Sequence, residues 1–225
     1  MKYKIETHAH TKEVSPCSWV YSKDLVDTYI SCGYDGIIIT DHYSRYYFDD
    51  ILPDILWEEK IDEYLKGYNN AKKYAEDKNI DIFLAIELTF IDTRNDYIIY
   101  GITKEYLLDN PKLHLSNISE FRDLANKSDL FIVQAHPWRP YLDIPIPDHL
   151  DAVEVYNGNR RHDSNNDIAL DFADKNDLLK TSGSDFHRLE DAAAGGMILP
   201  HRIKDLSEFI YLMKNKESEI ELIRG

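Results

Sequence analysis

The sequence has few of the features that mark secreted, membrane or nucleic-acid-binding proteins. Its only cysteines are Cys17 and Cys32, and its first residues do not form a secretory leader, so we expect no disulfide framework and a cytoplasmic location. No apolar run approaches the roughly 20 residues that a membrane span needs. Basic residues number 26 against 41 acidic ones, and the net charge of -15 argues against a nucleic-acid surface, which needs cations to neutralise phosphates.

Short apolar segments alternate with longer amphipathic ones, which is typical of repeated β-α units and a mostly parallel sheet. With 225 residues and no linker, repeat or low-complexity stretch, the chain is expected to form a single domain over residues 1–225. A closed barrel one unit short of eight and an open doubly wound sheet both fit the alternation. Strands are expected at 3–8, 36–40, 81–87, 97–101, 131–135, 152–156 and 179–184, and helices from Ser22 to Gly33 and at 57–78, 118–127, 165–176 and 205–216.

Five of the apolar segments end in side chains that bind metals. Residues two apart on an extended segment face the same side, so His8 lies beside His10 and Asp185 beside His187 in this prediction. Imidazole and carboxylate are the usual ligands of Zn²⁺, Mn²⁺ and Fe, and a closed barrel brings the ends of five strands to one point more easily than an open sheet. The segments end in His8 and His10, in Asp41 and His42, in Glu87, in His136, and in Asp185 and His187.

In this order the motifs resemble those of the PHP (polymerase and histidinol phosphatase) family of metal-dependent phosphoesterases. The matching segments are ETHAH, TDH, AIE, AHP and SDFH; one HxH alone would also fit an amidohydrolase, whereas the ordered set is specific. The resemblance implies a distorted (β/α)7 TIM-like barrel, the PHP fold, with two or three divalent ions (Zn, Mn or Fe). It implies His8, His10, Glu87 and Asp185 as ligands of the first ion, Glu87 and His136 of the second, and His42 and His187 of the third.

The sequence departs from the commonest family pattern at two positions. Many members have a His on the fourth strand, where this chain has NDYIIYG and Asp96 is the nearest ligand for the second ion. Many members also have an Asp or His five or six residues after the HxH, where this chain has Ser15 and Pro16. We take Glu13 as the candidate for the third ion, with a solvated loop charge as the alternative.

Clustered divalent ions activate water and bind phosphate, so the expected reaction is hydrolysis of a phosphate ester by a metal-activated hydroxide. His187 or Asp41 is expected to orient the water or protonate the leaving group, and Asp41 is alternatively a partner that fixes an imidazole. Cys17 lacks the CxxxxxR phosphate loop of thiol phosphatases and is not expected to be a nucleophile. Glu154 alternates with valines and is expected to support the site from below. The candidate substrate-binding residues are Arg139, Arg161, Arg188 and Asn157.

Three functions fit these residues. The preferred one is a phosphoesterase acting on a small phosphorylated molecule, such as histidinol phosphate or a nucleotide. The second is a PHP-type phosphotyrosine-protein phosphatase, which needs an open cleft, and the third is a non-catalytic metal-binding regulatory module. The aromatic segment from Tyr43 to Pro53 is expected to be a lid for a small substrate or, alternatively, the apolar packing of a long loop. The substrate, the native metal and the oligomeric state do not follow from the sequence.

Overall fold

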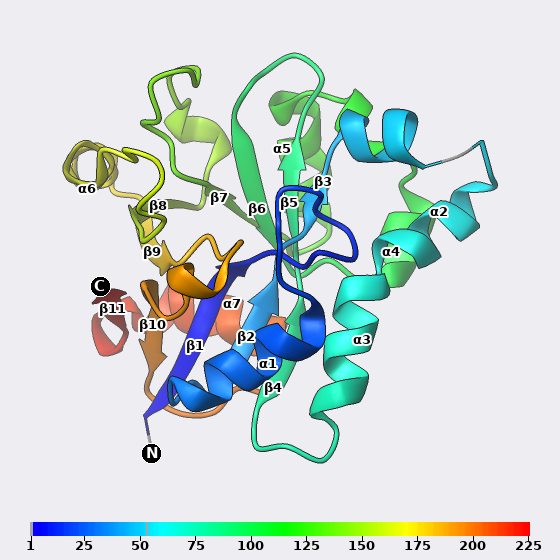
Figure 1. Cartoon of the computed structure of the whole chain (residues 1–225). Coiled ribbons are helices and arrows are strands. Elements are labelled where there is room, and N and C mark those ends of the chain that lie inside the picture. Colours follow the sequence, from blue (N-terminus) through cyan, green and yellow to red (C-terminus); the bar gives the residue numbers. More distant parts are fainter. Residues whose placement is uncertain (1, 53) are drawn as a thin grey trace.

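The computed structural model describes residues 2–52 and 54–225 (Figure 1), so Met1 and Pro53 of the predicted domain lie outside the described residues. The predicted α/β fold is confirmed, and the strands of the described residues pair in two sheets. One sheet contains β1 (Tyr3–Ala9), β2 (Gly36–Ile39), β4 (Asp81–Leu84), β10 (Gly195–Leu199) and β11 (Glu221–Arg224), in the order β11-β10-β1-β2-β4. The other contains β3 (His42–Tyr43), β5 (Ile86–Thr89), β6 (Asp96–Tyr100), β7 (Phe131–Gln134), β8 (Ala152–Asn157) and β9 (Leu179–Gly183), in the order β3-β5-β6-β7-β8-β9.

The helices follow the predicted β-α alternation, with one division and one short helix, Lys104–Asp109, that was not predicted. The segment predicted as a helix at 57–78 is two helices that meet at Leu65. Tyr21, not Ser22, occupies the position before the first helix. The helices are α1 (Ser22–Ser31), α2 (Trp57–Tyr64), α3 (Lys66–Ala75), α4 (Lys104–Asp109), α5 (Ile118–Lys127), α6 (Asn166–Lys175) and α7 (Leu206–Lys216). None of those in the described ranges has both the length and the apolar character needed to span a bilayer.

The expected distorted barrel takes the form of two sheets that meet along β1 and β9. The hydroxyl of Thr7 donates a hydrogen bond of 2.6 Å to the carbonyl of Ser182, and Ala9 forms an isolated bridge with Phe186. On the other side, the strand predicted at 81–87 divides at Ala85, so that β4 pairs with β2 while β5 pairs with β3 and β6. The chain therefore passes from one sheet to the other between β4 and β5, whereas contacts between strands join the two sheets along β1 and β9.

Apolar residues on the two faces of the first sheet explain its helical layers. On β2, Ile37 and Ile39 join the apolar cluster of α1 and α3, while Ile38 joins the cluster of α7, as alternation along a strand requires. Figure 1 shows α1 in front of β1 and β2, with α3 beside it. Close approach of α3 depends on Gly67, because a Cβ there would lie 2.0 Å from Thr11 Oγ1 and 2.8 Å from Asp41 Oδ2. This glycine sets α3 directly against the loop that follows β1.

The aromatic segment predicted as a lid packs mainly into the core. Residues Tyr46–Ile51 form a short π-helix, in which Tyr47 and Phe48 are buried and Tyr46 is exposed. Phe48 stacks on the buried ring of His114, with ring centroids 5.3 Å apart. The alternative interpretation, apolar packing of the segment, accounts for these rings, while Pro53 lies outside the described residues.

Candidate metal centre

His8, on β1, and His10, just after its end, begin the site, as their spacing predicts. His8 and His10 are fully buried and project to the same side, with their Nε2 atoms 3.1 Å apart. Nδ1 of His8 lies 2.8 Å from Oε1 of Glu154, and Nδ1 of His10 lies 3.3 Å from the Ser15 hydroxyl. Because each Nδ1 has a partner, Nε2 is the nitrogen that each ring presents to the site.

Two carboxylates complete a set of four converging donors. Glu87, on β5, places one oxygen 3.3 Å from Nε2 of His8 and the other 3.4 Å from Nε2 of His10. Oδ1 of Asp185, just after β9, lies 3.5 and 3.4 Å from the same two nitrogens. Ligand atoms of a tetrahedral ion with bonds of about 2.0 to 2.2 Å are about 3.3 to 3.6 Å apart. The four side chains predicted for the first ion therefore already have separations that suit one.

A second group of donors extends from Glu87 to His136. Nε2 of His136 lies 3.0 Å from Oε1 of Glu87, and together with His8 these side chains form a cluster of donors within 4.8 Å of one another. Asp96 lines the same pocket, and both burial and the nearby Glu87 carboxylate raise its pKa. A cation bound nearby would lower the pKa of such a carboxyl again and keep it ionised. Asp96 is nevertheless not part of the donor groups of the described residues, and its Oδ1 accepts the hydroxyl of Thr89, so its role as a second-ion ligand stays a prediction.

The third group is formed by imidazoles. Donor atoms of His10, His42 and His187 also lie within 4.8 Å of one another, and the ring centroid of His10 is 4.3 Å from each of the other two. Nδ1 of His187 hydrogen-bonds to the backbone carbonyl of Asp185 at 2.9 Å. Burial raises the pKa of the nearby Cys17 thiol, but the neighbouring imidazoles of His187 and His42 outweigh burial and lower the pKa to about 6.

Electrostatics at the site favour a bound cation. Burial lowers the pKa of His8, but the carboxylates of Glu154, Asp185 and Glu87 outweigh burial and raise it well above the usual range. Burial raises the pKa of Glu87, but His42 and His8 outweigh it and lower this pKa well below the usual range. Burial also raises the pKa of Asp185, but His8, His187 and Arg139 outweigh it and lower this pKa well below the usual range. Glu87 and Asp185 are therefore ionised, and buried anions require a compensating positive charge. The donor set and its charge both fit divalent metal ions.

Buried carboxylates behind the donors hold the loops in place. Oε2 of Glu154 accepts the backbone N–H of His136 at 3.0 Å, as expected for a residue supporting the site from below. Glu6 was not identified from the sequence, although a charged residue among the apolar residues of β1 was the available signal. Its Oε1 accepts the backbone N–H groups of His8 and Ser184, each at 2.9 Å. This carboxylate joins the strand end that carries His8 to the segment that leads to Asp185.

Three predicted site residues have other positions than expected. Glu13 is not part of the donor groups, because its carboxylate accepts the backbone N–H and hydroxyl of Ser22 at the start of α1. Asp41 is engaged by Thr11 and Ser15 through hydrogen bonds of 2.7 Å, so it orders the loop after β1 rather than facing the pocket. Burial, opposed by these bonds, raises the pKa of Asp41 to about 6. Asn157 accepts a hydrogen bond of 3.2 Å from Arg139, and so lies behind this arginine.

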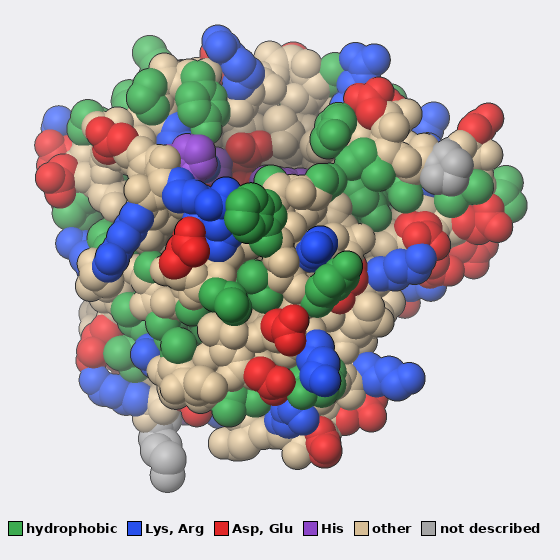
Figure 2. All heavy atoms as spheres, in the orientation of Figure 1, with side chains coloured by type: hydrophobic (Ala, Val, Ile, Leu, Met, Phe, Trp, Pro, Cys, Tyr) green, Lys and Arg blue, Asp and Glu red, His purple; other side chains and the backbone are tan. Residues whose placement is uncertain are grey.

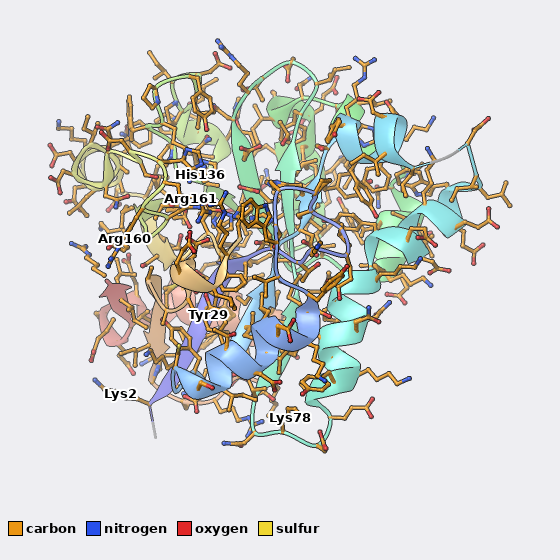
Figure 3. The ribbon with its side chains drawn as sticks, in the orientation of Figure 1. Lys2, Tyr29, Lys78, His136, Arg160 and Arg161 are labelled. Carbon is orange, nitrogen blue, oxygen red and sulfur yellow. The ribbon has the colours of Figure 1, made fainter. Side chains whose placement is uncertain are left out.

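A pocket of about 320 Å³ opens over the donors. Arg139, in its wall, pairs with Asp185 and is almost fully buried, whereas Arg161 pairs with Asp191 and Arg188 lies over the exposed ring of Trp19. Figure 2 shows histidine and cationic side chains beside a hollow on this face, and Figure 3 places His136 near Arg161. A larger groove, of about 770 Å³, includes Lys78 at the other end of the molecule in Figure 3 and is lined by none of the predicted ligands.

No protein-family model and no curated protein matches the sequence. Among solved structures, a two-domain protein from Bacteroides vulgatus, described as containing a predicted PHP-like metal-dependent phosphoesterase, is similar over 100% of this chain, with a TM-score of 0.72 and 16% identity. The present chain spans 65% of that protein's length. PsfC from Pseudomonas syringae is similar over 100% of this chain and 92% of its own, with a TM-score of 0.68 and 15% identity.

An amidohydrolase from Chromobacterium violaceum, whose structure contains bound sulfate and no metal, has a TM-score of 0.53 and 15% identity over 96% of this chain and 97% of its own. At these identities the comparisons establish the fold. The chain has the fold of PHP-like metal-dependent phosphoesterases over its full length, together with buried His, Asp and Glu clusters suited to several metal ions.

Proposed function

We propose that this chain is a metal-dependent phosphoesterase that hydrolyses a phosphate ester of a small molecule. The observation that supports this function most directly is the convergence of His8, His10, Glu87 and Asp185, with donor separations of 3.1 to 3.5 Å, beneath a pocket with arginines at its wall and rim. Carboxylate and imidazole donors suit Zn²⁺, Mn²⁺ or Fe, and guanidinium groups suit phosphate oxygens. Neither the metal donors nor the arginines alone would favour a phosphate substrate as strongly.

Divalent ions bound here would lower the pKa of a coordinated water and neutralise charge on the phosphoryl group. The first ion would be held by His8, His10, Glu87 and Asp185. Glu87 has one oxygen near Nε2 of His8 and the other near Nε2 of His10, while His136 lies beside the first oxygen. Glu87 would therefore bridge the first ion to a second, and Asp96 lines the pocket on this side.

The arginines have different tasks in this proposal. Arg139 keeps Asp185 ionised and oriented through their buried ion pair, and burial, outweighed by Asp185, leaves the pKa of Arg139 raised. Arg161 and Arg188 line the pocket nearer to its rim and are placed to bind non-bridging phosphate oxygens. His187 has a single nitrogen available to the site, because Nδ1 is bonded to Asp185. We assign that nitrogen to metal binding, so the leaving group takes its proton from solvent in the open pocket.

The substrate class follows from the shape of the site. Its donors are buried at the base of a pocket of about 320 Å³, which suits a small phosphorylated molecule better than the open cleft needed for a phosphotyrosine protein. Hydrolysis of an amide-like bond is the second candidate, since the fold is also similar to that of an amidohydrolase. The arginines favour the phosphate ester.

A panel assay tests the proposal. Protein stripped with a chelator is loaded separately with Mn²⁺, Zn²⁺ and Fe²⁺ and given sugar phosphates, mononucleotides, histidinol phosphate, a phosphotyrosine peptide and cyclic amides. We expect release of inorganic phosphate from at least one of the small esters. Metal-loaded protein that hydrolyses only the amides would replace the proposal with the second candidate, and loaded protein inactive on the whole panel would support a non-catalytic module.

A further inference from the structure

Among the described residues, the third group of donors, formed by His10, His42 and His187, has too few ligands for a metal ion of its own. Nε2 of His10 already converges with the donors of the first ion, which leaves His42 and His187 for a third. Glu13, the predicted additional ligand, is bound to Ser22 instead. An ion held by two imidazoles alone would lack the three or four protein ligands usual for Zn²⁺.

Cys17 is positioned to supply the missing ligand. Residues after Cys17 bind the segments that carry two of the histidines: the Ser18 hydroxyl donates to the carbonyl of His10 at 3.1 Å, and the Trp19 N–H donates to the carbonyl of His187 at 2.9 Å. On the other side of Cys17, the Ser15 hydroxyl accepts the N–H of His42 at 3.1 Å. These bonds fix the turn over the pocket, which Cys17 lines together with His42 and His187.

The free nitrogens of the two histidines also suit an ion beside this thiol. Nδ1 of His187 is hydrogen-bonded to the backbone carbonyl of Asp185, so this ring keeps Nε2 for a ligand. Nδ1 of His42 lies 2.7 Å from Oε2 of Glu87. Oε2 of Glu87 is completely buried and lacks a partner of hydrogen-bond geometry among the described residues. It lies between His42 and His10, so an unsatisfied anion is directed at this group of imidazoles.

We infer that Cys17 is a protein ligand of the third metal ion, together with His42 and His187. The inference rests on the metal centre of the proposed function but not on its phosphate substrate. One thiolate and two imidazoles with a remaining open position form a ligand set that suits Zn²⁺ or Co²⁺, whereas an oxygen ligand at this position would suit Mn²⁺ equally well. The thiol therefore makes this third position selective for a softer ion than the first two.

Cobalt spectroscopy tests the inference without an activity assay. Metal-free protein, kept reduced with a phosphine, is titrated with Co²⁺ to three equivalents while bound cobalt is measured. We expect a thiolate-to-cobalt charge-transfer band in the near ultraviolet for the wild type and for Cys32→Ser, the matched control, and complete loss of the band in Cys17→Ser. A band that persists in Cys17→Ser, or its absence from the wild type at any cobalt content, overturns the inference.

A second measurement avoids any change at the site. Cys17 is the only cysteine of the Cys32→Ser protein, so the rate of its modification by a thiol reagent reports this residue alone. We expect three equivalents of Zn²⁺ to slow modification by about tenfold or more, because only the free thiolate is nucleophilic; an unchanged rate contradicts the inference. Phosphate release is assayed on the same samples: a cobalt band without phosphatase activity rejects the proposed function alone, and activity without the band rejects the Cys17 ligand alone.

Discussion

Oε1 of Glu154 lies 2.8 Å from Nδ1 of His8, and both side chains are buried. The other oxygen of Glu154 accepts the backbone N–H of His136 and the side-chain N–H of Asn157. One carboxylate on β8 thereby orients an imidazole on β1 and the loop after β7. Carboxylate partners of this kind fix the tautomer of a metal-binding histidine and increase its basicity.

The variant Glu154→Gln tests this relationship. We expect the affinity for the ion at His8 to fall by about 10- to 100-fold while the fold is retained, because the amide removes the charge but keeps the shape. Competition with a chromogenic chelator measures the affinity. Glu58→Gln, at an exposed position of α2, is the matched control; equal affinities for the two variants would show that Glu154 does not tune the site.

Glu87 has the most demanding position, with one oxygen near His136 and the other near His42. Replacement by Gln removes the negative charge that makes neighbouring cations tolerable. We expect Glu87→Gln to lower turnover of the best phosphate ester by at least about a hundredfold, as for other lost electrostatic stabilisers, without unfolding. Turnover is compared with that of Glu120→Gln, on the surface of α5, and metal content is measured in parallel. Full activity with normal metal content would exclude the bridge.

The convergence of the ligands could be predicted because it depends on strand ends. An apolar run that ends in His, Asp or Glu places that side chain at a sheet edge, and five such runs with two spaced pairs suffice to indicate one site. Strand bounds were mostly correct for the same reason. The antiparallel β10 and β11 were missed: β10 begins with the pair Gly195 and Gly196, and β11 is partly exposed with charged ends, so neither has a clear apolar alternation.

The roles of the buried carboxylates could not be predicted, since they depend on contacts distant in sequence. Glu6 binds the N–H of Ser184, 178 positions away, and Asp41 binds Thr11 and Ser15, 30 and 26 positions away, beside Gly67 of α3. No local pattern reveals whether an acidic residue faces a pocket or accepts hydrogen bonds behind it. Glu13 is an example, because its carboxylate accepts a hydrogen bond from Ser22 at the start of α1 instead of facing the pocket.

His114 gives the fold a dependence on pH that is separate from the metal centre. The ring is buried against Phe48 and both of its nitrogens lack hydrogen-bond partners among the described residues. Burial, opposed by Asp49, lowers the pKa of His114 to about 4. Between pH 6.5, the usual pKa of histidine, and about pH 4, the unfolded state binds a proton at His114 that the native state does not. The stability that comes from burying the neutral ring is therefore fully present above pH 6.5 and is lost as the pH falls.

Urea unfolding of metal-free protein at several pH values measures this effect. We expect the free energy of unfolding of the wild type to fall more than that of His114→Leu between pH 7 and pH 4, by on the order of 2 kcal/mol after allowing for solvent screening. His201→Leu, at an exposed position, controls for the loss of a histidine as such. Parallel curves for the wild type and His114→Leu would mean that the ring is protonated without cost in the fold.

The source of the oxygen added to phosphate distinguishes activated water from a protein nucleophile. In a direct attack by water, one oxygen of the released phosphate comes from solvent in a single turnover, with enzyme in excess. A covalent phosphoryl-enzyme would also take up a solvent oxygen, but only after alcohol has been released in a burst. We expect one ¹⁸O per phosphate in H₂¹⁸O, alcohol and phosphate appearing together, and complete loss of turnover with a chelator that is restored by the metal. An alcohol burst ahead of phosphate, or turnover that survives chelation, would contradict hydrolysis by activated water at this centre.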